Sequence, residues 1–223
     1  MRYYPIFLDM VDKPAIVIGG GNIAHQKVTG LLDAGAKLTV VSPELNEEMR
    51  ALADEGRFEW VKRPYQPGDI NGYELVFVAT DDHEENRRVW QEGRELHIWV
   101  NAVDDVPNCD FIMPGIVRKG ELIVAISTSG GSPAMARKMR EDIQEFLSDE
   151  DAAMLDLATE VRRELREKDI KLLPDCPRCA RNGNDIWNAA LDGIVKDHLR
   201  EGNREAAKER MLNLLLSPTG LAE

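Results

Sequence analysis

The chain has 223 residues, a formal net charge of −12 and a hydrophobic share of 43%. This composition excludes an intrinsically disordered protein, and the length suffices for one full core and a smaller second region. The acidic balance argues against nucleic acid or an anionic membrane surface as partner, because both reward clustered Lys and Arg.

No apolar run approaches the ~20 residues that span a bilayer. We expect no signal peptide in the first residues, since Pro5, Asp9 and Asp12 interrupt any apolar core. Three cysteines do not make a disulfide framework. We therefore expect a cytoplasmic protein.

Short apolar runs alternate with helical patterns in the first part of the chain. Buried strands are expected at 15–18, 38–41, 75–79 and 98–100, a half-exposed strand at 58–62, and helices at 23–34, 44–55 and 83–95. This rhythm is typical of an α/β fold, in which a Rossmann-type parallel sheet carries helices on both faces.

The pattern changes after residue 114. Residues 115–118 and 122–126 predict an antiparallel hairpin, and Ser132 with Pro133 predicts the start of a helix that runs to about residue 147. Further helices are expected at 151–168, 184–200 and 203–216. We divide the chain into a nucleotide-binding domain of Rossmann type (1–114), a hairpin-plus-helix module (115–147) and a helical C-terminal domain (148–223).

A glycine loop follows the first strand and opens the first helix. Gly19-Gly20-Gly21-Asn22-Ile23-Ala24 fits the dinucleotide-binding pattern, in which glycines permit a tight turn and a close approach to a diphosphate. The helix N-terminus would supply free N–H groups for the phosphates. The alternative is a glycine-rich turn without a ligand.

The residues after the second strand bear on the choice of cofactor. NAD sites usually carry an acidic residue there, and this chain has Ser42-Pro43-Glu44. Glu44 comes late but could reach the ribose 2′-hydroxyl, and no Arg follows that would bind a 2′-phosphate. We predict NAD rather than NADP. Thr80, after the fourth strand, is a further cofactor candidate, although Asp82 beside it could simply cap the next helix.

Several blocks resemble one known family, the precorrin-2 dehydrogenase domain of siroheme synthases. They occur in the right order over residues 3 to about 147, and together they are specific. The blocks are Pro5–Leu8, Val17–Ala24 with Lys27, Ala79–Asp82 with Asn86, Asn101–Asp105, Asp110–Pro114, and Ile126–Pro133 with Ala136, Arg137 and Arg140. Where trifunctional enzymes continue into a methyltransferase domain, this sequence ends, so a stand-alone dehydrogenase is expected.

The resemblance implies a function and a set of site residues. The family oxidises precorrin-2 to sirohydrochlorin with NAD⁺, and some members also insert Fe²⁺ to give siroheme. By matching motif, Asn22, Ile23, Pro43 and Glu44 correspond to NAD contacts, to which we add Asn101, and Ser127 and Thr128 correspond to the loop that faces the tetrapyrrole. The hairpin and the following helix correspond to a module exchanged between the subunits of a homodimer.

The resemblance also makes Asp104 the candidate catalytic residue. A carboxylate at the end of a strand on the cofactor side could take a proton from the macrocycle as hydride leaves. The alternative is that the Asp104 carboxylate only caps a turn. Asp105 beside it competes for the catalytic role. For the substrate's carboxylates we expect partners at Lys27, Arg137 and the loop Ser127-Thr128-Ser129, which could otherwise be a plain capped turn.

The Cys176-Pro177-Arg178-Cys179 knuckle departs from what we expect of this family. It is half of a zinc or rubredoxin-like site, and the other half is missing from the sequence. Metal binding across a homodimer, a local redox pair and inert thiols all stay open. A third hypothesis is therefore an NAD-binding metallo- or redox-regulatory protein that uses this pair.

Overall fold

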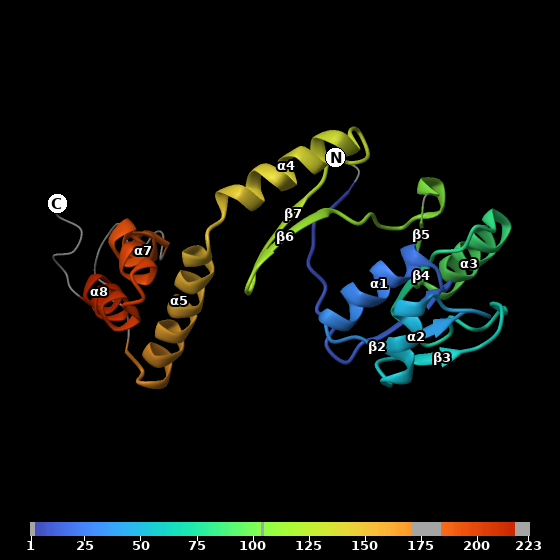
Figure 1. Ribbon diagram of the computed structural model, residues 1–223, viewed down its shortest axis with the longest axis horizontal. Coiled ribbons are helices and arrows are strands. Elements are labelled where there is room, and N and C mark those ends of the chain that lie inside the picture. Colours follow the sequence, from blue (N-terminus) through green and yellow to red (C-terminus); the bar gives the residue numbers. More distant parts are fainter. Residues whose placement is uncertain (1–2, 104, 171–183, 217–223) are drawn as a thin grey trace. The chain divides into compact units, whose positions relative to one another are not determined.

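The computed structural model describes residues 3–103, 105–170 and 184–216 (Figure 1). By its internal contacts the chain forms two compact units, residues 1–113 and 114–223, and each is described by itself. No helix within the described residues is long and apolar enough to cross a bilayer.

The first unit is a parallel sheet with helices on both faces, as predicted. Its strands stand in the order β3-β2-β1-β4-β5, and β1 and β4, which are distant in sequence, are neighbours. Its elements are β1 (Pro14–Ile18), α1 (Asn22–Asp33), β2 (Lys37–Val41), α2 (Glu47–Asp54), β3 (Glu59–Val61), β4 (Leu75–Val78), α3 (His83–Leu96), β5 (Trp99–Ala102) and the 3₁₀ turn η1 (Val106–Asn108).

The central strand β1 is apolar on both sides because both sides are covered. Ala15 and Val17 pack in a cluster with residues of α1 and α2. Ile16 and Ile18 point the other way, as alternate residues of a strand must, and pack with α3. This double burial explains why the strand is a continuous apolar run rather than an alternating one.

The second unit consists of a hairpin and helices. Strands β6 (Gly115–Lys119) and β7 (Leu122–Ile126) pair antiparallel, as predicted, and α4 (Pro133–Phe146) packs on them. Ser132 accepts a hydrogen bond from the Met135 N–H at 3.2 Å and so caps α4. The remaining helices are α5 (Asp149–Glu167), α6 (Asn184–Ala190), α7 (Gly193–Arg200) and α8 (Arg204–Leu216).

The helices α5 to α8 have a core of their own. Leu157 and Val161 of α5 are fully buried together with Met211 of α8. Ion pairs cross the surface of this bundle: Lys208 contacts Glu160 at 2.6 Å, and Lys196 contacts Asp151 at 2.5 Å. The tail is therefore a packed helical bundle over its described residues.

Two of the expected helices differ from the structure by more than two residues. The helix expected at 44–55 begins at Glu47, because the Asn46 side chain accepts from the Met49 N–H at 2.9 Å and caps it there. The single helix expected at 184–200 is two helices, α6 and α7. Asp192 separates them, since its carboxylate caps α7 and pairs with Arg210 of α8.

Candidate cofactor site

The glycine loop follows β1 at the carboxyl edge of the sheet, next to the end of β4. Gly19 has φ +120°, and a Cβ there would lie 2.3 Å from the Ala79 carbonyl oxygen. A Cβ on Gly20 would lie 1.9 Å from the Glu44 carbonyl oxygen. Only glycine fits these two positions, because the chain itself occupies the space.

Gly21 differs from its two neighbours. A Cβ on it would meet nothing within 4 Å, and its backbone is extended, at φ −88° and ψ −171°. It is the N-cap residue of α1 and provides no side-chain cap, and no acidic residue stands in the first turn. The open space, the N–H groups of the helix start and its positive dipole fit a diphosphate.

The loop after β2 is bonded to the glycine loop. The Asn46 N–H donates to the Gly20 carbonyl at 2.9 Å, and the Asn46 amide donates to Asn22 Oδ1 at 2.9 Å. Ser42 is only 6% exposed, and its hydroxyl donates to the Glu44 carbonyl at 2.6 Å. Ser42 thus shapes the loop from within, while Pro43 and Glu44 stand exposed beside Gly20.

The end of β4 carries Thr80. Its hydroxyl donates to Asn86 Oδ1 at 2.9 Å, and Asn86, on α3, is 1% exposed. Asp82 caps α3 by accepting from the N–H groups of Glu84 and Glu85. Partial burial and the nearby Asp82 raise the pKa of the Glu85 carboxyl. Thr80 therefore lies at the same edge as the glycine loop, held by a buried amide.

The end of β5 approaches this edge as well. Strand β5 runs to Ala102, two residues further than expected, and the Val103 N–H donates to the Val78 carbonyl at 2.9 Å. Asn101 is 7% exposed, and its amide donates to the Phe111 carbonyl at 2.8 Å. Asp104 itself lies outside the described residues, between Val103 and Asp105.

Lys27 extends from α1 over an aromatic pair. Its ammonium lies 5.8 Å from the ring centroid of Phe77, and that ring meets Phe111 edge-on at 5.4 Å. The side chain is half-buried.

The candidate substrate loop belongs to the second unit. The Ser129 N–H donates to Ser127 Oγ at 3.0 Å, and the Thr128 hydroxyl bonds both the carbonyl and the N–H of Ser132. Ser129 has φ +53°, so the loop turns sharply before α4. Ser127, Ser129 and Arg137 are exposed, whereas Thr128 is half-buried by these internal bonds.

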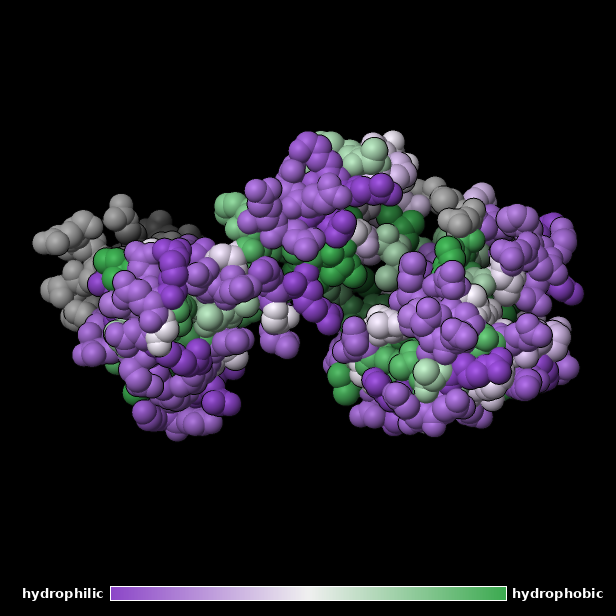
Figure 2. Space-filling view, viewed as in Figure 1, coloured by the Kyte–Doolittle hydropathy of each residue, from purple (hydrophilic) through white to green (hydrophobic). Residues whose placement is uncertain are grey.

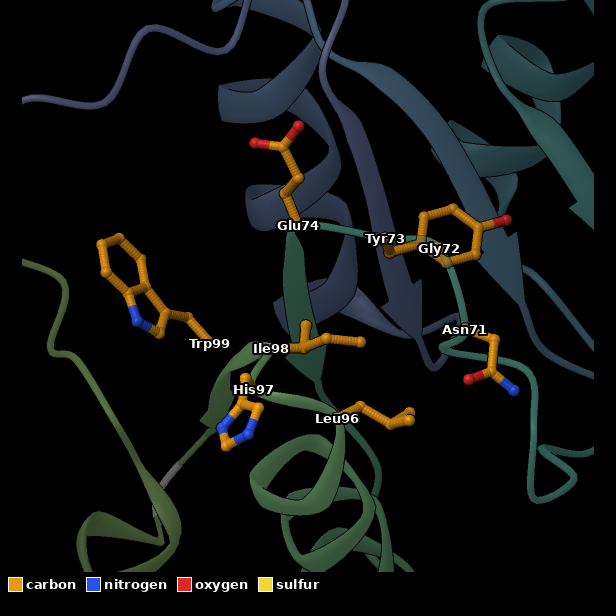
Figure 3. A pocket seen from close by; sticks show the side chains of 8 residues that line it. All are labelled: Asn71, Gly72, Tyr73, Glu74, Leu96, His97, Ile98 and Trp99. Atoms are coloured by element: carbon orange, nitrogen blue, oxygen red, sulfur yellow. The ribbon is translucent and has the colours of Figure 1, made fainter.

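A groove in the first unit lies at the opposite edge of the sheet (Figure 3). Its lining comes from the segments that lead into β4 and β5, including Glu74, His97 and Trp99. Those segments meet the amino ends of the strands, away from the glycine loop. In open α/β sheets ligands bind at the carboxyl ends, so we place the candidate site there and not in the groove.

No cluster of His, Cys, Asp and Glu within the described residues could hold a metal ion. Cys176 and Cys179 lie outside those residues.

Comparisons with known proteins agree with this geometry. Residues 6–115 match a family model described as "Putative NAD(P)-binding". Siroheme synthase 1 of Aeromonas salmonicida is 44% identical over 147 residues, which are 66% of this chain and 31% of that protein. Siroheme synthase 1 of Pectobacterium atrosepticum is 38% identical over 217 residues, which are 97% of this chain and 44% of that protein.

Over nearly its whole length the chain is a homologue of siroheme synthases. The resemblance drawn from the sequence motifs is thereby confirmed, and so is a nicotinamide dinucleotide as the class of cofactor. The chain spans less than half the length of these curated relatives, 31% and 44%.

A solved structure supports the fold of this chain. The structure titled "SirC, precorrin-2 dehydrogenase" matches with a TM-score of 0.70 over 95% of this chain and 100% of that chain, at 20% sequence identity. The match includes the helical C-terminal region, which resembled the family in sequence only by being helical.

Sequence reasoning missed three residues that shape the site. Asn46 joins the two loops, Asn86 holds Thr80, and Cys109 bonds the turn after β5. Asn86 stood in a family block without a role, and Asn46 carried the signal of an N-cap before a helix. Nothing in the sequence marked Cys109.

Proposed function

We propose that the chain is an NAD-dependent dehydrogenase that oxidises precorrin-2 to sirohydrochlorin. One observation carries the proposal: the open space at Gly21, where the N-terminus of α1 meets the carboxyl edge of the sheet. The chain's relatives are named siroheme synthases. The resemblance of its motifs to the dehydrogenase domain of that family implies precorrin-2 as the substrate.

The proposed reaction removes a hydride and a proton from precorrin-2. NAD⁺, when bound, supplies the hydride acceptor. The N–H groups at the start of α1 would hold its diphosphate, and Pro43 and Glu44, which are exposed after β2, would contact its adenosine ribose. The Asp104 carboxylate takes the proton that the macrocycle loses, so that electrons and charge balance.

NAD is proposed over NADP because of Glu44. Its carbonyl lies against Gly20, and its side chain is exposed in the loop after β2. A carboxylate there accepts from a ribose 2′-hydroxyl and repels a 2′-phosphate. We expect NAD⁺ to bind at least about tenfold more tightly than NADP⁺, or ~1.4 kcal/mol. Calorimetric titration of both cofactors measures the ratio, and equal affinities would refute the assignment.

Asp104 is tested by substitution. A positioned general base contributes about 10²–10⁴-fold in rate, so Asp104→Ala should lose that factor in anaerobic turnover of precorrin-2 with NAD⁺. NAD⁺ affinity should not change. Asp105→Ala is the matched control and should lose much less. Normal turnover by Asp104→Ala would move the base elsewhere.

For the substrate's carboxylates we propose Lys27, Arg137 and the loop Ser127–Ser129. The loop offers exposed hydroxyl and N–H groups, and Arg137 is exposed on the first turns of α4. Charge-assisted hydrogen bonds of this kind suit an anionic ligand on an otherwise acidic chain.

A bifunctional enzyme is the second candidate, favoured by the name siroheme synthase that the relatives carry. Siroheme requires metal insertion into sirohydrochlorin. Incubating the purified chain with sirohydrochlorin and Fe²⁺ or Co²⁺, with and without NAD⁺, separates the two. Metal insertion above the uncatalysed rate identifies a chelatase, and its absence leaves the dehydrogenase alone.

We further propose a cytoplasmic homodimer formed through the module 115–147, with 148–223 as its helical domain. No residue of α4 is buried, and its Met135 is 50% exposed. Ile116 of the hairpin is 45% exposed. A two-stranded sheet with one helix is too small to be stable in water with these apolar side chains exposed. A second copy of the chain would cover them.

A further inference from the structure

The edge strand β3 brings two basic residues to the carboxyl edge of the sheet. Strand β3 pairs parallel with β2, with Val61 opposite Val41, and the Ser42 N–H donates to the Val61 carbonyl at 3.2 Å (Figure 1). Lys62 and Arg63 follow directly in the sequence. The chain after β3 therefore starts beside the loop after β2, which is the loop proposed to contact the adenosine ribose.

The two cations differ in their partners. The Arg63 guanidinium donates to both carboxylate oxygens of Asp69, at 2.7 Å and 2.6 Å, and to the Pro64 carbonyl at 3.0 Å. A bidentate pair of this kind fixes the guanidinium in place. Lys62 is exposed, and its ammonium forms no ion pair with any residue that the structure describes. An anion bound at this edge would therefore meet Lys62 rather than Arg63.

Trp60 holds the Lys62 ammonium close to the loop after β2. The ammonium lies 5.3 Å from the centroid of the Trp60 ring, where the electron-rich face of an indole attracts a cation. The ring itself is half-buried against the core, and its N–H donates to the Ser42 carbonyl at 3.0 Å. The ammonium thus lies over a ring that is bonded to the first residue after β2.

We propose that Lys62 is a second determinant of cofactor choice: its ammonium attracts the 2′-phosphate of NADP⁺ and so opposes Glu44. The inference rests on the proposed function, because it takes the loop after β2 as the contact of the adenosine ribose. NAD⁺ and NADP⁺ differ only at the 2′ position of this ribose, which carries a hydroxyl or a phosphate. The Glu44 carboxylate favours the hydroxyl, and the Lys62 ammonium favours the phosphate. The preference for NAD⁺ is then the difference between two opposed charges.

Substitution of Lys62 should change the ratio of the two affinities. Lys62→Gln removes the charge, and we expect the ratio of NADP⁺ to NAD⁺ affinity to fall about fivefold, as for an exposed ammonium that pairs with a phosphate dianion. Lys62→Glu should lower the ratio further, because it adds repulsion. Lys62→Arg keeps the charge and should keep the ratio within about twofold. Calorimetric titration with both cofactors measures the ratio, and circular dichroism verifies folding.

Lys37→Gln is the matched control. Lys37 is also an exposed lysine of this sheet, but it begins β2 at the opposite edge and pairs with Asp12 at 3.2 Å. Its substitution changes the net charge of the chain by the same amount. It should leave the ratio of the two affinities unchanged, because its charge is remote from the ribose and screened by salt.

The Glu44→Gln background provides a second measurement, which does not depend on how weakly the wild-type chain binds NADP⁺. Removing the repulsion should raise NADP⁺ affinity at least about fivefold, and adding Lys62→Gln should lower it again by about fivefold. Salt should weaken NADP⁺ binding more steeply in Glu44→Gln than in the double variant, over about 0.05 M to about 0.5 M KCl. A residue that only supports the fold would not change this slope.

The outcomes distinguish this inference from the proposed function. The role of Lys62 is overturned, while NAD⁺ binding stands, if Lys62→Gln leaves the ratio unchanged in both backgrounds. Failure of Glu44→Gln to bind NADP⁺ at all has the same consequence. A wild-type chain that binds neither cofactor overturns the proposed function, and the role of Lys62 with it.

Discussion

Gly21 is the residue at which binding can be separated from folding. Nothing within 4 Å would meet a side chain there, so a substitution should not disturb the fold. Gly21→Asp would place a side chain and a negative charge in the space proposed for the diphosphate. We expect NAD⁺ affinity to fall at least about 10²-fold, because charge repulsion adds to steric exclusion.

The control for this variant is on the same helix. Gly30→Asp also enters open space, but at the far end of α1, and should leave NAD⁺ affinity within about twofold. Titration of both variants, with circular dichroism to verify folding, measures the effect. Unchanged affinity in a folded Gly21→Asp would remove the cofactor from this loop.

Whether the role of a residue could be predicted from the sequence depends on which contacts fix its position. The glycine loop was predictable, because a buried strand, three glycines and a helix impose one backbone path. The bonds of Asn101 and Cys109 were not, since they join a strand to a chain segment that returns to it from several residues away. Local sequence carries no signal for such a return.

At the scale of elements, strands were predictable and helix starts less so. The apolar runs predicted the buried strands to within two residues, because burial on both faces demands continuous apolar sequence. The start of α2 was misplaced because Glu44 and Leu45 suit a helix locally. In the structure the Asn46 N–H donates to the Gly20 carbonyl, and the Asn46 side chain caps α2. The break between α6 and α7 likewise depends on Arg210, which comes from α8.

The contact between α5 and α8 should make stability depend on pH. Hydrogen bonds from Lys208 and then Arg204 lower the pKa of Glu160 to about 2. A carboxyl whose folded pKa lies below its unfolded value of roughly 4.3 stabilises the fold above that pH, and the contribution is lost as pH falls toward 2. Glu160→Gln should therefore lower the urea midpoint at pH 7, and the difference from wild type should shrink between pH 4 and pH 2.

Glu167→Gln serves as the control, because Glu167 is exposed at the end of the same helix. It should leave the midpoint unchanged within error at both pH values. A deficit in Glu160→Gln that is as large at low pH as at pH 7 would contradict the role of its charge.

At the scale of the whole molecule, the proposed dimer can be tested through the exposed side chains of α4 and the hairpin. Figure 2 shows hydrophobic surface in the region of α4 and the hairpin. We expect a dimer by light scattering at micromolar concentration. Met135→Glu with Met139→Glu, which places two charges on side chains that are 50% and 36% exposed, should shift it to monomer.

Leu216→Glu is the matched control for the dimer. It adds the same charge at an apolar side chain that is 43% exposed, but at the end of α8. It should leave the molar mass unchanged. A monomeric wild-type chain, or a dimer that tolerates both methionine changes, would place the interface elsewhere.

The three glycines of the loop also differ in what constrains each position during evolution. Gly19 and Gly20 are fixed by the protein's own carbonyl groups, at 2.3 Å and 1.9 Å from where a Cβ would stand. Gly21 is constrained only by what binds there. In a descendant that kept this fold but gave up its dinucleotide, drift would reach position 21 first, while positions 19 and 20 would stay glycine. In a survey of divergent sequences, a change at position 21 alone would thus indicate lost cofactor binding, whereas changes at positions 19 and 20 would indicate a changed structure.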